Sequence, residues 1–235
     1  NRVLINDMSI YYNPSIVTDG LVLCLDAANR DSYPGTGTAW NDISGSNSSG
    51  GTLTNGPVFS SANNGNIFFD GSNDYINFYA SDITTIATVE IWCKIGSAYN
   101  GKMIFGWAYY DVWCGSSHLG YNTANGDLYG ISSSTVSNLG IINNWAHYIF
   151  EMTPVSYTNN NIYINTIKQS LSKQLGGNEV QNRGFNNGNG RIACWRNDQN
   201  YMMPMNCGSF RVYNRALTPI EIIQNFKAMR NRYGV

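Results

Sequence analysis

The aromatic side chains of this 235-residue chain are its best candidates for ligand chemistry. Four of them fall in one short stretch and a fifth precedes an arginine: Trp107, Tyr109, Tyr110, Trp113, and Trp195 with Arg196. An aromatic ring can stack on the apolar face of a pyranose, and amide or guanidinium groups beside it can bond the sugar hydroxyls. The candidate glycan-binding residues are therefore Trp107, Tyr110, Trp113, Trp195 and Arg196.

Strand alternation limits how many of these rings can reach solvent. On one continuous strand, Trp107 and Tyr109 would share a face and Tyr110 would lie on the other. Some of the rings must therefore belong to the core. The sequence leaves three roles open for the group: core packing, contact between subunits, and contact with a glycan.

A short acidic segment offers the chain's most compact set of oxygen ligands for a metal ion. Asp70, Asn73 and Asp74 supply the hard oxygen atoms that Ca²⁺ prefers, but calcium needs about six to eight such ligands. Asp and Asn are also favoured in tight turns for local hydrogen bonding. A calcium site and a simple turn are both compatible with this segment.

Acid catalysis of glycoside cleavage would require a pair of carboxylates. The two groups lie about 5 to 9.5 Å apart in known mechanisms, which acids two or four positions apart on one strand face can provide. The four glutamates have no acidic neighbour at those spacings: Glu90, Glu151, Glu179 and Glu221. His118 and His147 fall in no nucleophile motif, so we expect structural roles for both. The chain is not predicted to be an enzyme.

Charged residues are scarce. Lys and Arg total 14 against 15 Asp and Glu, and charged residues make up 12% of the chain, where about 25% is usual. Glycine, and asparagine at about one residue in seven, fill the polar share. A nucleic acid or an anionic membrane would need a concentrated basic surface, so neither is an expected partner. No apolar run approaches the roughly 18 residues that span a bilayer.

The five cysteines do not form a recognisable framework. Cys24, Cys93, Cys114, Cys194 and Cys207 are an odd number without a CxxC pair, so neither a disulfide scaffold nor a zinc site is indicated. Buried free thiols, formed in a reducing compartment, are the simplest interpretation. A contact between Cys194 and Cys207 across neighbouring strands stays open.

Short apolar segments separated by Gly, Asn and Ser clusters recur along the chain, which is typical of an antiparallel all-β protein. The predicted strands are 21–26, 66–70, 75–79, 88–95, 103–109, 145–152, 161–166, 190–195 and 209–213. Turn residues between apolar runs predict hairpins at 69–75 and around 160–171. One domain of this size can hold all the strands.

The end of the chain predicts one amphipathic helix. Thr218, Pro219 and Glu221 match an N-cap, a first helical position and a capping box, and Gly234 can end the helix. A cationic cluster lies in its last turns: Lys227, Arg230 and Arg232. We expect these cations to complement the helix dipole, although they could also form a phosphate site.

A series of ordered motifs carries a family resemblance. They are GLVLCLDAAN at 20–29, SYPGTGTAWNDISG at 32–45, GTLTNGP at 51–57, FDGSNDYI at 69–76, VEIW at 89–92, WAHY at 145–148, NIYIN at 161–165 and FRVYNRALTP at 210–219. This series resembles laminin-G-like, concanavalin A-like lectin/glucanase domains. The ending, QNF at 224–226 and RYG at 232–234, resembles the version found in structural proteins of tailed bacteriophages.

The resemblance implies an all-β fold: a concanavalin A-like jelly-roll sandwich of two antiparallel sheets, with one short C-terminal helix. Residues 1–19 would form an N-terminal arm and residues 20–235 the jelly-roll domain. No cofactor is expected, although relatives of this kind often hold one calcium at a sheet edge, so a bound calcium stays open. No signal peptide is recognised, and because the chain begins at Asn1, a processed N-terminal piece stays open.

The function implied is that of a non-enzymatic virion structural protein of a tailed bacteriophage, as a head decoration, a head fibre or a tail-fibre domain. Its expected partners are other virion proteins, such as the major capsid or fibre proteins, further copies of itself in a homo-oligomer, and cell-surface glycans. Its expected location is the virion, after assembly in the bacterial cytoplasm. The alternative is a carbohydrate-binding lectin module of a secreted or surface bacterial protein, located outside the cell.

Overall fold

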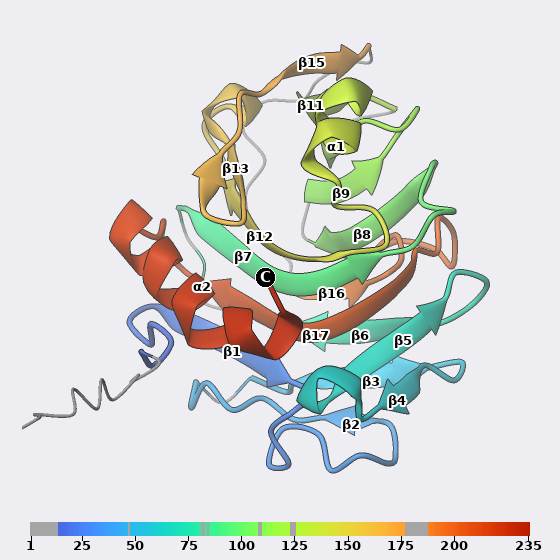
Figure 1. The fold of residues 1–235 in the computed structure, drawn as a ribbon, viewed down its shortest axis with the longest axis vertical. Coiled ribbons are helices and arrows are strands. Elements are labelled where there is room, and N and C mark those ends of the chain that lie inside the picture. The colour runs from blue at the N-terminus through green and yellow to red at the C-terminus, as the bar shows by residue number, and fades with distance from the viewer. Residues whose placement is uncertain are drawn as a thin grey trace, which may run out of the picture.

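The computed structural model describes residues 14–46, 48–80, 83, 85–107, 110–122, 126–176 and 188–235. Within these ranges, strands form two antiparallel sheets that pack face to face in a jelly-roll sandwich, and helix α2 (Pro219–Tyr233) lies outside one of them (Figure 1). The predicted all-β fold with a C-terminal helix is confirmed. In the described part of the chain, no helix has both the length and the apolar character needed to cross a membrane.

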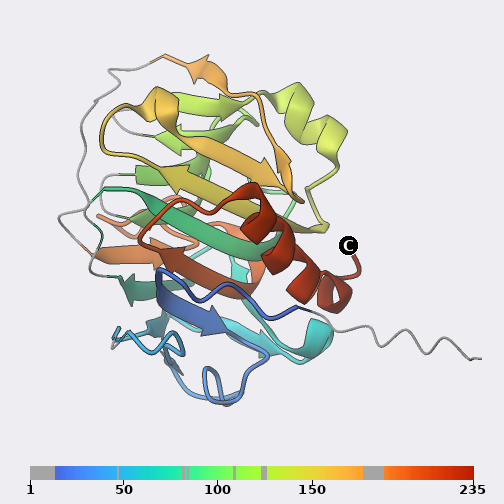
Figure 2. The same cartoon turned by 90° about the vertical axis from the view of Figure 1, so that its left-hand side faces the viewer.

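The first sheet has eight strands in the order β14-β13-β12-β7-β17-β5-β4, with β1 also paired to β17. Its strands are β1 (Leu21–Asp26), β4 (Val58–Ser60), β5 (Asn66–Asp70), β7 (Ala87–Ile95), β12 (Trp145–Met152), β13 (Asn161–Ile164), β14 (Ile167–Lys168) and β17 (Pro204–Tyr213). The long strand β17 pairs with β5 through its first half and with β1 through its second half. Figure 2 shows α2 lying across this sheet.

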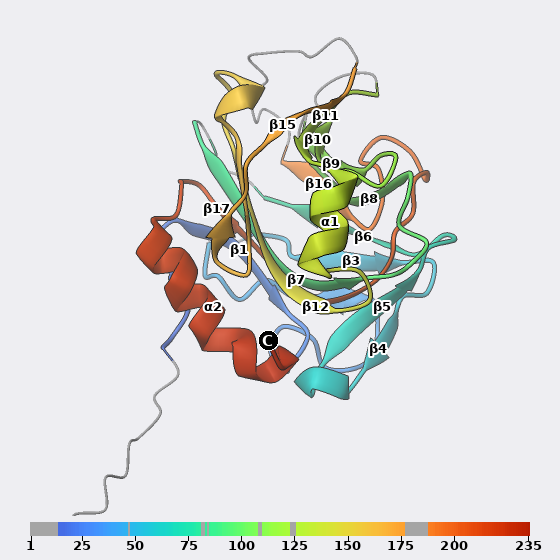
Figure 3. The same cartoon turned by 45° about the horizontal axis from the view of Figure 1, so that its top comes forward.

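The second sheet has nine strands in the order β15-β11-β10-β9-β8-β16-β6-β3-β2. Its strands are β2 (Ala39–Trp40), β3 (Gly51–Thr54), β6 (Tyr75–Tyr79), β8 (Lys102–Trp107), β9 (Tyr110–Cys114), β10 (Leu119–Asn122), β11 (Leu128–Ile131), β15 (Ser172–Leu175) and β16 (Asn189–Ile192). A short helix, α1 (Ser133–Leu139), follows β11, and two 3-10 turns span Ala62–Asn64 and Tyr157–Asn159. Figure 3 shows α1 and α2 at separate places on the sandwich.

The core fills the space between the two sheets. Phe105 of the second sheet meets Phe150 and Phe210 of the first, with ring centroids 5.5 and 5.9 Å apart. Strand β7 is buried along nearly its whole length because the second sheet covers one face and α2 covers the other. The side chains alternate accordingly: Val89, Ile91 and Cys93 face the core, and Glu90 and Trp92 face α2.

Helix α2 begins and ends as the sequence predicts. The Thr218 side chain accepts a bond from the Glu221 N–H (3.3 Å), the Glu221 carboxylate accepts one from the Thr218 N–H (2.8 Å), and Pro219 is the first helical residue. Glu221 also pairs with Arg215 just before the helix, at 2.7 Å. Gly234 follows the helix with a φ of 70°, in the left-handed region.

One predicted hairpin is wrong. The segment 69–75 contains a tight turn, but β5 on one side of it belongs to the first sheet and β6 on the other side to the second. β5 pairs with β4 and β17, and β6 pairs with β3 and β16. The turn chemistry is local, whereas strand pairing in a sandwich is decided by distant partners. The second hairpin is confirmed, because β13 pairs with β14 across Asn165 and Thr166.

The end of the predicted N-terminal arm packs on the sandwich. The Val17 N–H donates to the Asn225 side chain on α2 (2.7 Å), and the Val17 carbonyl accepts a bond from the Tyr213 hydroxyl (3.1 Å). Figure 2 shows this segment beside α2. Residues 1–13 lie outside the described residues, so a domain boundary at 19–20 stays a prediction.

Replacing Thr218 with Ala should lower the free energy of unfolding by about 1 kcal/mol, because the first turn of α2 loses its side-chain acceptor. Thr218→Ser keeps the hydroxyl and serves as the matched control. Urea unfolding followed by tryptophan fluorescence would measure both. Equal stability of the two variants would show that the cap contributes nothing to the anchoring of α2.

Candidate functional site

Trp107 and Tyr110 lie inside the sandwich. They face each other across the β8–β9 pairing, and both are buried in the core between the sheets. The Trp107 indole N–H donates to the Gly188 carbonyl (3.0 Å), and the Tyr110 hydroxyl donates to the Thr153 carbonyl. These two members of the predicted glycan set thus have internal roles in the described structure. Tyr109 lies outside the described residues.

Trp113 lies on the opposite, outer face of the second sheet. It is partly exposed on β9, and its indole N–H donates to the Asp127 carbonyl (3.1 Å). Asp111 lies two residues earlier on the same strand and so shares this face. The outer face of the second sheet is therefore the surface where the predicted residues can meet a ligand.

Trp195 and Arg196 are brought together on this outer face by Asp111. The Trp195 indole N–H donates to Asp111 Oδ2 (3.0 Å), and Arg196 forms an ion pair with the same oxygen. The Asp111 side chain is only 3% exposed, whereas that of Arg196 is 15% exposed. One buried carboxylate thus fixes the direction of a partly exposed indole and of the neighbouring guanidinium.

The loop 193–203, which carries Trp195, is stabilised by hydrogen bonds between its own backbone groups and by contact with strand β8. The Trp195 N–H donates to the Asn200 carbonyl (3.1 Å), and the Met203 N–H donates to the Ala193 carbonyl (2.9 Å). Gly106 on β8 lies directly beneath, where a Cβ would come within 2.7 Å of the Arg196 nitrogen. The missing side chain allows the loop to rest on the sheet, so the site sits on a rigid base.

Tyr201 adds a second exposed ring to the loop. It is 45% exposed, and its ring lies edge-on to Trp195 with centroids 6.0 Å apart. Its φ of 60° is in the left-handed region, which is strained for a bulky side chain. The Met103 N–H holds the Tyr201 carbonyl at 2.8 Å and supports this conformation. Strain retained at a surface aromatic residue is more typical of a functional site than of a passive loop.

Arg191 extends the polar part of the same face. Its guanidinium lies 4.8 Å from the centre of the Tyr75 ring, donates to the Asn77 side chain (3.2 Å) and donates to the Trp195 carbonyl (3.2 Å). Aromatic rings, guanidinium groups and amides therefore alternate across β6, β16 and the loop above them. This mixture can stack on a sugar ring and bond its hydroxyls.

Three residues of this site escaped the sequence analysis: Asp111, Arg191 and Tyr201. Asp111 carries no signal, because a single acid in an aromatic strand has no recognisable motif. Tyr201 follows the polar run 196–200, and its proximity to Trp195 depends on the closure of the loop. A search for aromatic residues flanking that polar run could have found it.

The predicted calcium ligands take part in a turn. Asp70 Oδ1 accepts bonds from the Ser72 N–H (2.7 Å) and the Asn73 N–H (3.3 Å), which lower the pKa of Asp70. Asp74 Oδ2 accepts the Asp70 N–H (3.1 Å), and burial raises the pKa of Asp74. Among the described residues, no group of three His, Cys, Asp or Glu side chains is placed to hold a metal ion. Calcium binding by Asp70, Asn73 and Asp74 stays a prediction.

Both histidines make structural hydrogen bonds, as predicted. His118 Nδ1 accepts the Ser133 N–H at the start of α1 (2.9 Å), and His147 Nε2 lies 3.0 Å from Glu90 Oε1 in the interior. The five cysteines are all buried and free. Cys207 faces Cys93 across β17 and β7, whereas Cys194, within the loop 193–203, packs with Tyr75 and Met202.

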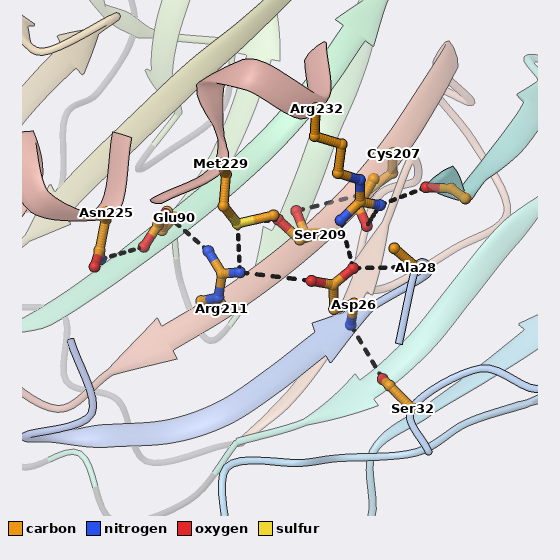
Figure 4. Close-up of polar contacts among 12 residues, drawn as sticks. Asp26, Ala28, Ser32, Glu90, Cys207, Ser209, Arg211, Asn225, Met229 and Arg232 are labelled. Atoms are coloured by element: carbon orange, nitrogen blue, oxygen red, sulfur yellow. Dashed lines mark hydrogen bonds and ion pairs between the residues drawn. The ribbon is translucent and has the colours of Figure 1, made fainter. Parts of the chain in front are cut away.

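A buried polar cluster lies on the other side of the molecule, between the first sheet and α2 (Figure 4). Glu90 accepts bonds from Arg211 (2.9 Å) and Asn225 (2.7 Å) and is 0% exposed. Burial alone would raise the pKa of Glu90, but the Arg211 charge and the bonds from His147 and Asn225 outweigh it and hold the pKa at about 2. Glu90 is therefore a fixed anion.

A second ion pair, between Arg232 and Asp26, lies next to the Glu90 cluster. Arg232 on α2 donates to Asp26 Oδ1 (2.6 Å), to the Asn63 carbonyl (2.7 Å) and to the carbonyls of Gly65 and Gly208 (Figure 4). Of the predicted cationic cluster, Arg232 thus points into the fold and joins α2 to β1. Arg211 lies 3.8 Å from the other oxygen of Asp26.

An open pocket of about 390 Å³ lies beside these two pairs, between α2, β1 and residues 14–16. Its lining includes the charged side chains of Asp26, Arg211 and Arg232 and the apolar side chains of Ile43, Ala228 and Met229. The recess therefore combines charged side chains with an apolar wall. Sequence patterns do not reveal it, because its residues come from separate segments that meet only in the folded chain.

Comparison with known proteins gives structural neighbours alone. No protein-family model and no curated protein matches the chain. The ligand binding domain of botulinum neurotoxin serotype D, solved with N-acetylneuraminic acid, is similar, with a TM-score of 0.64, 13% identity, and coverage of 90% of this chain and 51% of that one. The binding domain of Paraclostridial Mosquitocidal Protein 1 gives a TM-score of 0.62, 17% identity and coverage of 89% and 52%.

A third neighbour is the binding domain of botulinum neurotoxin DC in complex with SialylT, with a TM-score of 0.61, 13% identity and coverage of 90% and 52%. The chain spans about half the length of these domains. At such low identity the likeness shows the fold, which is shared with binding domains.

Glu90→Gln should lower the free energy of unfolding by about 3 to 5 kcal/mol near neutral pH, because Arg211 keeps a buried charge without its carboxylate. The native pKa of about 2 lies below the ordinary 4.5, so ionised Glu90 stabilises the fold above pH 4.5, and this contribution is lost as the pH falls through 2. The difference between wild type and variant should therefore shrink over that interval, as urea unfolding at several pH values would show.

Glu221→Gln is the matched control, since it removes a carboxylate from a partly exposed ion pair with Arg215. Such pairs contribute about 0 to 1 kcal/mol. If the free energy of unfolding of Glu90→Gln equals or exceeds that of Glu221→Gln, the buried cluster does not stabilise the fold as expected.

Proposed function

We propose that this chain is a carbohydrate-binding module whose principal glycan site is the outer face of the second sheet around Trp195. The observation that carries the proposal is the anchoring of the Trp195 indole by buried Asp111, with exposed Tyr201 beside it. Rings held in one direction contribute contact area without losing conformational freedom on binding. Arg196 and Arg191 supply hydrogen-bond donors next to the rings.

The structural neighbours support this assignment. Two of them were solved with N-acetylneuraminic acid or with SialylT, and all three are binding domains. They support a binding role for this fold. The residues of loop 193–203 would determine which glycan this chain prefers. The set of residues carried forward from the sequence is therefore Trp113, Trp195 and Arg196, joined by Tyr201 and Asp111.

Catalysis is not part of the proposal. Glu90 and Glu221 are held as anions by arginine partners, with pKa values of about 2, so neither can donate a proton near neutral pH. Glu151 is buried and bonded by the Asn161 amide (2.9 Å). The surface chemistry supports glycan binding on anchored aromatic rings.

Trp195→Ala and Tyr201→Ala should each weaken glycan binding at least about tenfold, which corresponds to about 1.4 kcal/mol. The measurement is a glycan array of neutral and sialylated oligosaccharides, followed by calorimetry on the strongest ligand. Phe68→Ala is the matched control, because Phe68 is 42% exposed on the first sheet, away from the site. Thermal unfolding would confirm that the variants fold.

Binding that survives both substitutions, or an array without any signal, would contradict this site. A loss of binding in Phe68→Ala as well would point to a general effect on folding.

The finer proposal concerns where the module is displayed. We propose a tailed-phage particle, as a head decoration, a head fibre or a tail-fibre domain, assembled beside capsid or fibre proteins. The five free, buried cysteines support assembly in a reducing cytoplasm. The phage-like ending supports it less strongly, because Asn225 and Arg232 of that ending serve the fold.

Mass spectrometry of purified particles from the source of this sequence should find the chain in stoichiometric amounts. Its presence in the particle-free culture medium alone would instead favour a secreted lectin module. Either outcome is independent of the Trp195 experiment.

A further inference from the structure

We propose that the pocket beside α2 is a second binding site, which takes a single uncharged sugar ring, either free or at the end of a glycan. It lies outside the first sheet, whereas the Trp195 site lies outside the second, so the two sites share no residue. Its volume of about 390 Å³ falls in the range of about 300 to 1,000 Å³ that is usual for small-molecule sites.

Arg211 is short of hydrogen-bond acceptors on the pocket side. One of its terminal nitrogens bonds Glu90, and the other meets the thioether sulfur of Met229 at 2.7 Å, which is a weak acceptor. Its Nε is buried without a hydrogen-bond acceptor among the described residues, and because it has almost no accessible surface it lies out of reach of a ligand in the pocket. Cys24, opposite Arg211 in the β1–β17 pairing, offers only a thiol.

The terminal nitrogen beside Met229 has only that weak acceptor, so a ligand oxygen at this end of Arg211 would be a stronger partner than the thioether. Asp26 offers the complementary group. Its Oδ1 is occupied by Arg232 and by the Ala28 N–H (2.9 Å), whereas its Oδ2 lies 3.8 Å from Arg211, beyond hydrogen-bond distance (Figure 4). A ligand can therefore supply two partners: a donor within hydrogen-bond distance of Asp26 Oδ2, and a strong acceptor for Arg211.

Neighbouring hydroxyls of a sugar would satisfy both groups, because each hydroxyl can donate and accept. One hydroxyl would donate to Asp26 Oδ2, and the next would accept from Arg211. Ile43, Ala228 and Met229 provide an apolar wall for the C–H face of the ring. Asn29 at the rim adds an amide.

Charge balance favours an uncharged ligand. Arg211 is paired with Glu90, and Arg232 is paired with Asp26, so the cations and carboxylates around the pocket cancel. An anion would have to approach Asp26, and a cation would have to approach two arginines. The pocket thus offers donors and acceptors without a net charge.

The experiment is saturation-transfer NMR with glucose, galactose, mannose and N-acetylglucosamine, in a Trp195→Ala, Tyr201→Ala background that weakens the other site. At least one sugar should bind, and Ala228→Trp should weaken its binding at least about tenfold by filling the pocket from α2. Lys227→Trp is the matched control, since Lys227 is exposed and does not line the pocket; less than about a twofold effect is expected.

Ile43→Trp fills the pocket from the opposite wall and should repeat the effect if Ala228→Trp proves unstable. Acetate and phosphate should not displace the sugar. The proposal is overturned if no sugar binds, if both filling variants still bind, or if acetate or phosphate competes. Because the Trp195 site carries the same substitutions in every sample and the filling variants change only the pocket beside α2, none of these results bears on the proposed principal site.

Discussion

The arrangement of the first sheet and α2 depends on one buried anion, Glu90. An ionised carboxylate inside a protein is costly unless charge and hydrogen bonds surround it. Here the partners come from β17, β12 and α2, in Arg211, His147 and Asn225. Asn225 also bonds Val17, so the same cluster fixes the chain segment before β1. Because one terminal nitrogen of Arg211 is committed to Glu90, the other is left beside the pocket with Met229 as a weak acceptor.

Much of the fold could be predicted from local sequence. Strands such as 66–70, 75–79 and 145–152 have the predicted bounds, and the capping residues Thr218 and Glu221 place the start of α2. Pairing between strands could not be predicted in the same way. The turn at 70–74 obeys local rules but joins strands of different sheets, because pairing is decided by residues far along the chain. Helix α1, seven residues capped by Ser132, was too short to show an apolar period.

The candidate site shows the same limit at the level of single rings. Treating 103–109 as one strand placed Trp107 and Tyr110 on opposite faces. β8 ends at Trp107, and β9 begins at Tyr110 and pairs with it, so both rings point inward. Trp195 and Arg196 lie in a loop, where alternation does not apply, and their exposure is set by Asp111 and Gly106. Residue types could suggest sugar-binding chemistry, but only the folded chain assigns each ring to the core or to the surface.

The low charge of the sequence takes on a more specific meaning in the structure. Several charged residues form internal pairs: Glu90 with Arg211, Asp26 with Arg232, and Asp111 with Arg196. These charges serve the fold and orient site residues, which leaves a surface rich in amides, hydroxyls and glycine. Such a surface binds each sugar weakly, because single hydroxyl contacts mostly replace those with water. Two sites on opposite faces of one rigid sandwich could not both engage a single flat surface, so they would gain avidity only by bridging separate glycan chains on either side of the module.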